Sequence, residues 1–443
     1  MKNNSSLLFT YILLQVVCTQ SIAQKEDYTW FSGYDSYAGL PWGTNVQSFT
    51  IDSMHVTYDS LGMNFARTNT SYCNSDGNPM FYTNGIHIRN GLDEIVEESW
   101  GMNEGQFIVQ FDPTIEQKGY RVPQGIVALQ NPSNPEQYYL LHTFWDTSAT
   151  LGSYPKRLLY TLLDMSQNAG HGKVLAKNQV IIENFGGIGT EISVCRHANG
   201  RDWWVLTNQR ETNCFYRTLI DHTGIHAQPN KVCTGSIVPI NNITSSAFSP
   251  NGSKFAYLSL VEGATVFDFD RCEGLLSNPV QIPIGGLLDS GWWSLGTCIS
   301  PNNRFLYVGI TQYVLQYDLQ DPDIAASVDT VAIYDGFQAP FGSFFHTMQL
   351  GPDGKIYESC GNGERVYHVI EQPDKKGDSC MFKQHHILLP TYSAGVPNFP
   401  NYRLGALPNS PCDTLGTSIS QPTTRNPQLT IFPNPATEFV VID

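Results

Sequence analysis

The segments SPNGSKFAYLS (residues 249–259), SPNNRFLYVGI (residues 300–310) and GPDGKIYESC (residues 351–360) repeat one pattern along this chain. The interval between copies is 51 residues, from Ser249 to Ser300 and from Ser300 to Gly351. A fixed interval of about 40–50 residues is typical of repeat proteins, in which each unit must pack on its neighbours to bury its apolar face. Each copy places turn-forming residues before an aromatic-rich strand, which predicts a β-hairpin with residues of positive φ in its turn.

Further strands extend this pattern in both directions. A second aromatic-rich strand follows the three copies at residues 266–270, 314–319 and 366–370, and HANGRDWW around Asn199-Gly200 is a fourth copy. Looser copies occur near residues 75–90 and 131–145. Units of this length fit four-stranded blades, and blades arranged around an axis form a β-propeller.

The number of repeats predicts an all-β propeller of seven four-stranded blades, with six or eight blades as alternatives. After the last copy the chain has room for about one more strand, at residues 397–404, so we expect the seventh blade to use strands from residues 28–60 as well. Joining the N- and C-terminal strands in one sheet closes the ring and leaves fewer exposed sheet edges.

The composition supports this fold and excludes one class of partner. Of the 443 residues 15% are charged, against about 25% in ordinary globular domains, and 12% are aromatic, which suits many short strands. The net charge is −15. Because affinity for nucleic acid and anionic lipid comes from Lys and Arg, we expect no nucleic-acid partner.

Both ends of the chain indicate export. Residues 1–23 read as a signal peptide cleaved before Gln24, and their apolar run is too short for a permanent membrane span. We expect the propeller over residues 24–407 and a Pro/Ser/Thr-rich linker over residues 408–428. Residues 429–443 then read as two short strands around a Pro-Asn-Pro turn.

Nine cysteines remain after Ala23, so disulfides are expected in an exported chain, with at least one thiol left unpaired. Their connectivity cannot be derived from the sequence, and the absence of a CxxC motif gives no support to a zinc ribbon or a thioredoxin-like redox site.

Two parts of the sequence resemble known families. LTIFPNPATEFVVI, with Pro433, Asn434, Pro435 and Ala436 at its centre, resembles the start of the type A C-terminal sorting domain of the type IX secretion system of Bacteroidota. The resemblance implies a small β-sandwich sorting domain, here incomplete, with the type IX secretion machinery as a partner. The body, with ISPNNRFLYV and PNFPNYRLG, is similar to uncharacterised exported propellers near the WD-repeat, YVTN and quinoprotein amine dehydrogenase-like groups.

The sequence carries no signature of a catalytic, metal or cofactor site. HExxH, GxSxG, GxxxxGK[ST] and EF-hand patterns are absent. GGIGTE at residues 186–191 is read as a loop between blades, and His385-His386 as a loop pair rather than metal ligands. Asn74, Asp76 and Asn78 have alternate calcium-loop spacing, but the turn reading is favoured because no bidentate Glu follows.

A few polar and aromatic residues are candidates for ligand binding. Aromatic rings beside charged groups are typical of carbohydrate and peptide sites, while the alternative reading is packing in the core or between blades. The candidates are Arg196, His197, Asp202, His142, Trp292 and Trp293.

Three functions compete on these observations. A non-catalytic propeller on the cell surface or outside the cell, binding a protein or a glycan, is the favoured interpretation, since loops on a radial scaffold form broad binding surfaces. A lactonase-type hydrolase is the alternative suggested by the YVTN resemblance, and a quinoprotein is the third. A deep axial funnel with converging His, Asp, Glu or Arg would favour an enzyme, whereas a filled axis would favour binding.

Overall fold

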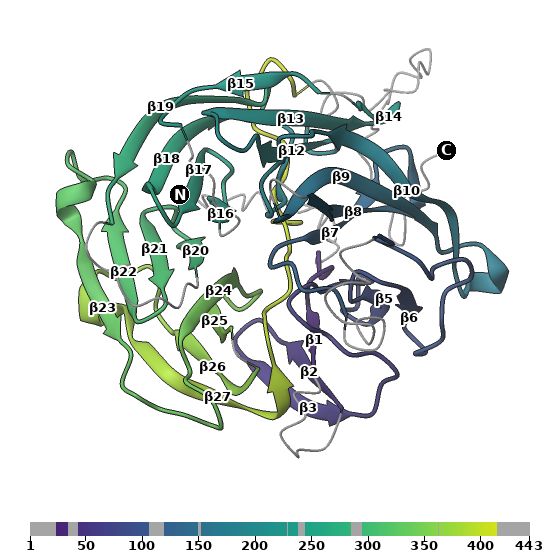
Figure 1. Cartoon of the computed structure of the whole chain (residues 1–443), viewed down its shortest axis with the longest axis horizontal. Helices are drawn as coiled ribbons and strands as arrows, with labels where there is room; N and C mark the ends of the chain where they lie inside the picture. Colours follow the sequence, from purple (N-terminus) through teal and green to yellow (C-terminus); the bar gives the residue numbers. More distant parts are fainter. Residues whose placement is uncertain are drawn as a thin grey trace, which may run out of the picture.

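The chain forms a ring of seven β-sheets around a central axis (Figure 1). This structure is a computed structural model, and it describes residues 24–33, 43–105, 119–148, 152–227, 229–237, 244–284, 295–361 and 363–413. The predicted all-β, seven-bladed propeller is confirmed, and no α-helix occurs in these ranges. Consequently, the described part of the chain has no helix that is long and apolar enough to cross a membrane.

The sheets follow one another in chain order and are numbered here as blades 1 to 7. Blade 1 holds β1 (Thr29–Ser32), β2 (Thr44–Phe49) and β3 (Met54–Asp59), and blade 2 holds β4 (Thr70–Cys73), β5 (Pro79–Thr83) and β6 (Ile88–Asn90). Blade 3 holds β7 (Ile126–Asn131), β8 (Asn134–Ser148), β9 (Gly152–Asp164) and β10 (Lys173–Glu183). Blade 4 holds β11 (Ser193–Arg196), β12 (Trp203–Asn208), β13 (Cys214–Asp221), β14 (Gly224–Ile225) and β15 (Lys231–Cys233).

The last three blades contain the three sequence repeats and have four strands each. Blade 5 holds β16 (Thr244–Phe248), β17 (Lys254–Ser259), β18 (Gly263–Asp270) and β19 (Leu275–Ile282). Blade 6 holds β20 (Leu295–Ile299), β21 (Phe305–Ile310), β22 (Tyr313–Asp318) and β23 (Asp329–Ile333). Blade 7 holds β24 (Phe345–Leu350), β25 (Ile356–Cys360), β26 (Glu364–Ile370) and β27 (Phe382–Ser393). The expectation of four strands per blade holds for blades 3 and 5 to 7, whereas the described residues give blades 1 and 2 three strands and blade 4 five.

The ring has two different faces. In blades 2 to 7 the connection from the first to the second strand lies on one side, which we call the turn face. The connections from the second to the third strand, and from each blade to the next, lie on the other side, which we call the loop face. The turn face carries the sequence repeat, because each repeat begins at the end of an innermost strand.

The repeated turns differ in one detail from the predicted hairpin turns. Gly252, Asn303 and Gly354 have φ of 72°, 63° and 78°, but the residue before each is not at positive φ. Pro250 and its counterparts hold φ near −65°, as the second residue of a type I turn requires. The Gly252 N–H accordingly donates to the Ser249 carbonyl at 2.8 Å, and the left-handed residue precedes β17, which begins at Lys254.

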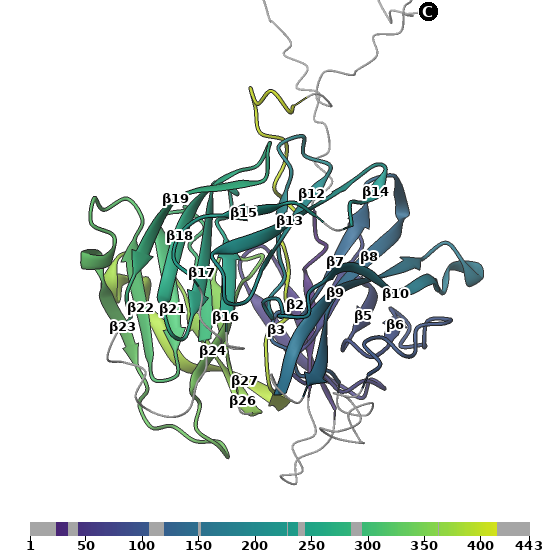
Figure 2. The same cartoon turned by 45° about the horizontal axis from the view of Figure 1, so that its top comes forward.

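The C-terminal end of the propeller corrects the predicted closure. Residues 397–404 form no strand and do not pair in the sheet of β1, β2 and β3. They run instead through the ring from the loop face to the turn face (Figure 2). Pro397 and Pro400 explain the difference, because proline has no N–H to donate to a strand ladder.

This axial segment, residues 394–407, nevertheless joins the two ends of the chain. Arg403 forms a double ion pair with Asp27 just before β1, at 2.6 and 2.8 Å. Val396, Phe399 and Tyr402 belong to the largest apolar cluster, which also contains residues of blades 1, 2, 3, 4 and 7. The ring is therefore closed by packing and side-chain pairing around its axis.

Two disulfides hold the structure, one at the loop-face end of blade 4 and one on the turn face. Cys214 on β13 is bonded to Cys233 on β15, and Cys272 in blade 5 is bonded to Cys412 after the axial segment. The second bond ties residue 412, within the predicted linker, to the propeller. The five other described cysteines are free and buried. Disulfides of this kind indicate a protein that matures in an oxidising compartment outside the cytoplasm.

Candidate functional site

The axis of the ring is occupied by the chain itself. The Asn398 side-chain amide donates to the carbonyls of Ile126 and Ile192, each at 3.1 Å. The Tyr402 hydroxyl donates to the Ala128 carbonyl at 2.7 Å, and its side chain is buried. These bonds fix the segment against the innermost strands of blades 3 and 4, so no open funnel passes through the ring on that side.

A cavity of about 270 Å³ remains between the axial segment and blades 4 to 7. Its charged lining groups are Asp27 and Arg403, which pair with each other, and Arg196. Every amide and hydroxyl side chain in its lining already makes at least one hydrogen bond within the protein. These are Gln124, Ser193, Ser246, Ser249, Thr297, Gln349, Asn398 and Asn401. The described lining of the cavity therefore presents no free acid beside a free base, as a hydrolase needs.

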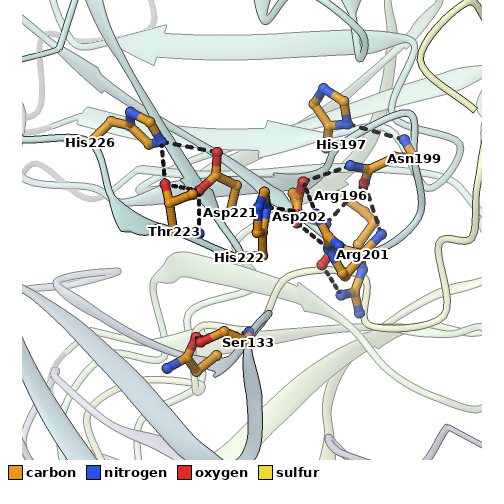
Figure 3. Close-up of polar contacts among 11 residues, drawn as sticks. Ser133, Arg196, His197, Asn199, Arg201, Asp202, Asp221, His222, Thr223 and His226 are labelled. Carbon is orange, nitrogen blue, oxygen red and sulfur yellow. Dashed lines mark hydrogen bonds and ion pairs between the residues drawn. The ribbon is translucent and has the colours of Figure 1, made fainter. Parts of the chain in front are cut away.

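Arg196, His197 and Asp202 come together in one turn of blade 4 (Figure 3). The Asp202 carboxylate accepts from Arg201 at 2.6 Å and from the Asn199 amide at 2.6 Å. His197 accepts the Asn199 N–H at 3.1 Å on Nδ1 and donates from Nε2 to the Cys272 carbonyl at 3.0 Å. All three polar groups thus have partners that stabilise the turn.

Arg196 has a structural task in the same turn. Its guanidinium lies 3.5 Å from the centre of the Trp203 ring and donates to the carbonyls of Arg201 and Tyr402 at 3.0 and 3.2 Å. Burial lowers the pKa of Arg196 to about 10. Arg196 therefore links blade 4 to the axial segment, and both neighbouring tryptophans of this turn are buried.

The other predicted residues lie elsewhere. His142 on β8 is fully buried, with Nδ1 2.7 Å from the Asn103 amide oxygen and Nε2 3.0 Å from the Thr161 hydroxyl. Burial lowers its pKa to about 3, so it is a neutral core histidine. Trp292, Trp293 and the motif Pro433, Asn434, Pro435 and Ala436 lie outside the described residues.

The two adjacent histidines that resembled metal ligands do not share a site. His385 lies 2.9 Å from Asp335, and His386 lies 3.5 Å from Glu371. In the described ranges three possible ligands converge only at Cys272, Glu273 and Cys412, whose two sulfurs are joined as a disulfide. The described residues thus hold no group of three free metal ligands.

One pair that resembles a nucleophile and its base was missed by sequence reasoning. Cys360 Sγ lies 3.2 Å from His368 Nε2 in blade 7. His368 Nδ1 accepts the His385 N–H, so Nε2 carries the ring proton and donates to the Ser343 carbonyl at 3.0 Å. No ring lone pair is left to take the thiol proton, and burial raises the pKa of Cys360 well above its usual value. The Cys360–His368 pair is therefore an unreactive part of the core.

The loop face differs from the turn face in its buried polar groups. Five described side chains each have two buried polar atoms without a hydrogen-bond partner. All five lie in the loop-face half of the ring. They are Asn69, His87, Arg210, Glu358 and Glu364. Asn69 precedes β4, His87 and Arg210 lie between second and third strands, and Glu364 is the first residue of β26. Glu358 lies two residues before the loop-face end of β25.

Burial sets the ionisation of these groups. It raises the pKa of Glu364 to about 7 and that of Glu358 well above its usual value, and it lowers the pKa of His87 to about 4. Glu191, buried near the axis on the same face, has its pKa raised to about 6 by burial although Thr190 and Thr244 donate to it. Unpartnered buried polar groups are rare, and groups whose pKa is strongly shifted by burial are candidates for a functional site.

Comparison with known proteins shows the fold alone. No family model matches the chain, and no curated protein matches its sequence. A functionally unknown protein from Desulfotomaculum acetoxidans is 13% identical with a TM-score of 0.47, covering 83% of this chain and 98% of that one. The periplasmic gluconolactonase of Pseudomonas aeruginosa is 13% identical with a TM-score of 0.44, covering 83% and 97%. Likeness at this level says nothing about activity.

Proposed function

We propose that this protein is an exported, non-catalytic binding module that engages a protein or glycan partner on its loop face. The observation that supports this most is the unequal treatment of buried polar groups on the two faces. The turn face is held by the Arg403–Asp27 pair, the axial segment and a disulfide, and none of its described side chains has two unpartnered buried polar atoms. Unpartnered groups gather on the loop face, where connections of variable length lie.

The alternative of lactonase-type hydrolysis receives less support from the geometry. A hydrolase needs a nucleophile or an activated water beside a base, with a free path for substrate. The axial cavity presents Asp27 and Arg403 already paired, and the Cys360–His368 pair is buried without a free base. A binding module requires only a shaped surface with a few polar anchors.

The test is a ligand search followed by mapping of the bound face. The full chain is applied to glycan and peptide arrays, and the strongest ligand is then tested by hydrogen exchange. We expect protection in loop-face connections such as residues 84–87, 184–192 and 209–213. Protection confined to the turns near Gly200, Gly252 and Gly354 would contradict the proposal.

We also propose that the type IX secretion machinery exports the protein, on the signal peptide and the Pro-Asn-Pro-Ala motif. The disulfides support a route out of the cytoplasm. Fractionation of a Bacteroidota host that produces the protein should place it at the cell surface or in the medium. Substituting Pro433 and Pro435 together with alanine should leave it in the periplasm, and unchanged release would contradict this route.

A further inference from the structure

Arg210 is a buried cation that forms no ion pair with another described residue. It lies in the loop-face connection between β12 and β13, its side chain is 6% exposed, and Nε and Nη1 have no hydrogen-bond partner among the described residues. The acid that acts on Arg210 electrostatically is Glu211, the exposed next residue in the same connection, but no ion pair joins the two side chains. A buried charge is costly unless it is paired, so this arrangement indicates a missing anion.

The glycine-rich loop explains how Arg210 reaches its position. Gly187 has φ of +99°, and a Cβ there would lie 2.5 Å from Cδ and 3.0 Å from Nη1 of Arg210. Glycine at position 187 therefore leaves room for the Arg210 side chain to pack against the loop backbone. On its other side the guanidinium lies 5.9 Å from the centre of the Tyr154 ring.

An exposed aromatic ring stands on the same loop. Phe185, two residues before Gly187, is 72% exposed, and Lys156 Nζ lies 4.9 Å from its ring centre. A flat exposed ring offers the apolar face that a pyranose can pack on, and a guanidinium matches a carboxylate with two parallel N–H donors. A ring and an unpaired guanidinium on adjoining loops together fit a sugar that carries a carboxylate.

We propose that Arg210 binds the carboxylate of a uronic-acid residue in an acidic polysaccharide, with the sugar ring packed on Phe185, at the loop face between blades 3 and 4. This rests on the proposed binding function and names its ligand class. Because Nε and Nη1 are out of reach of solvent, binding requires the connection over residues 209–213 to open. Glu211 in that connection has φ of +61°, a conformation that costs a non-glycine residue energy and that binding can release.

The experiment uses two forms of one polymer and the full chain. Polygalacturonate carries the carboxylates, whereas fully methyl-esterified pectin has the same sugars without charge. Binding is measured by calorimetry in about 0.15 M salt, where long-range charge effects are screened. The chain's net charge of −15 repels a polyanion, so attraction must come from a local site. We expect binding to polygalacturonate only.

Variants connect this binding to the proposed site. Arg210→Gln should weaken polygalacturonate binding about 10- to 100-fold, the range for a lost charge-assisted contact, and Phe185→Ala should weaken it less. Arg304→Gln makes the same charge change on the turn face, where Arg304 pairs with Asp318, and should bind like the wild type. Since Arg210→Gln removes an unpaired buried charge, its melting temperature should be equal to or above that of the wild type.

Several results would overturn the proposal. Equal binding of the esterified polymer would show recognition of neutral sugar, and binding of poly-glutamate alone, lost in Arg210→Gln, would show a peptide ligand. Both results keep the loop-face function while removing the uronate. The proposal would also be wrong if neither polymer bound, or if Arg210→Gln bound as well as the wild type. A clear drop in the melting temperature of Arg210→Gln would contradict it too, because it would show that Arg210 is a structural residue.

Discussion

On the turn face Arg403 pairs with Asp27 and Arg304 with Asp318, whereas on the loop face Arg210, Glu358 and Glu364 have no such partner within the described residues. The two faces are built on the same strands, so the difference does not come from the fold. Paired charges and repeated turns on one face stabilise the ring. Side chains with two unpartnered polar atoms on the other face lower stability, and such groups call for an explanation, of which a ligand is one.

The largest expected effect tests the closure on the turn face. The Cys272–Cys412 disulfide spans 140 residues and Cys214–Cys233 spans 19. Loop-closure entropy predicts losses of about 5 and about 3 kcal/mol when each pair is replaced by serine. Urea denaturation of the two double variants measures the difference. Equal losses would mean that the axial segment stays ordered without its disulfide.

A second prediction removes the ion pair between the two ends of the chain. Asp27 is almost completely buried, so Arg403→Met leaves an unpaired buried carboxylate and should cost about 3–5 kcal/mol. Lys254→Met is the control, because its pair with Asp268 is much more exposed and should cost about 1 kcal/mol or less. A loss from Arg403→Met as small as that of the control would show that the pair does not close the ring.

The turn face was largely predictable from the sequence, because its turns depend on neighbouring residues. Ser249 to Gly252 hold their own type I turn, and the 51-residue interval sets the blades. The position of the axial segment in the 51-residue repeat predicts a strand. Pro397 and Pro400 were the available signal against strand pairing.

The loop face could not be predicted in the same way. Arg210 became a candidate only because Gly187, in the connection from the preceding blade, lies against it and because two of its nitrogens have no hydrogen-bond partner. Such contacts depend on how two blades pack against each other, so they leave no pattern in the local sequence. Arg196 and His197 show the opposite case, since their composition suggested a ligand site although both side chains hydrogen-bond to backbone carbonyls.

A third prediction concerns pH and tests the unpartnered carboxyls. Burial raises the pKa of Glu364 to about 7, so between about pH 4.5 and 7 the folded state holds a proton that the unfolded state has lost. Stability therefore falls as pH rises through this range, by about 3 kcal/mol from this group. Glu364→Gln should remove the part of the fall that Glu364 contributes and leave the parts from Glu191 and Glu358, whose pKa values burial also raises, as measured by urea denaturation at a series of pH values.

Glu371, which follows the turn-face end of β26, provides the control for this prediction. Although burial opposes it, pairing with Lys355 and Lys383 lowers the pKa of Glu371, so its contribution is present above the unfolded pKa and is lost as pH falls. Glu371→Gln should therefore reduce the free energy of unfolding at neutral pH. The fall in stability that Glu364 causes between pH 4.5 and 7 should remain in this variant. The same pH profile in both variants would show that Glu364 is not the source.

The smallest expected effect separates two costs within the repeated turn. A Cβ at Gly252 would lie 2.7 Å from Cys195 Sγ and 2.8 Å from Arg271 Cδ, while a Cβ at Gly354 meets nothing within 4 Å among the described residues. Both glycines are at positive φ, so both valine variants incur backbone strain, of about 1 kcal/mol. Gly252→Val adds a clash between neighbouring blades and should reach about 3 kcal/mol. Because the two positions share one turn type, the difference between their denaturation midpoints measures packing alone. Equal midpoints would mean that the turn face tolerates movement between blades, and the contrast between the two faces would then rest on charge pairing only.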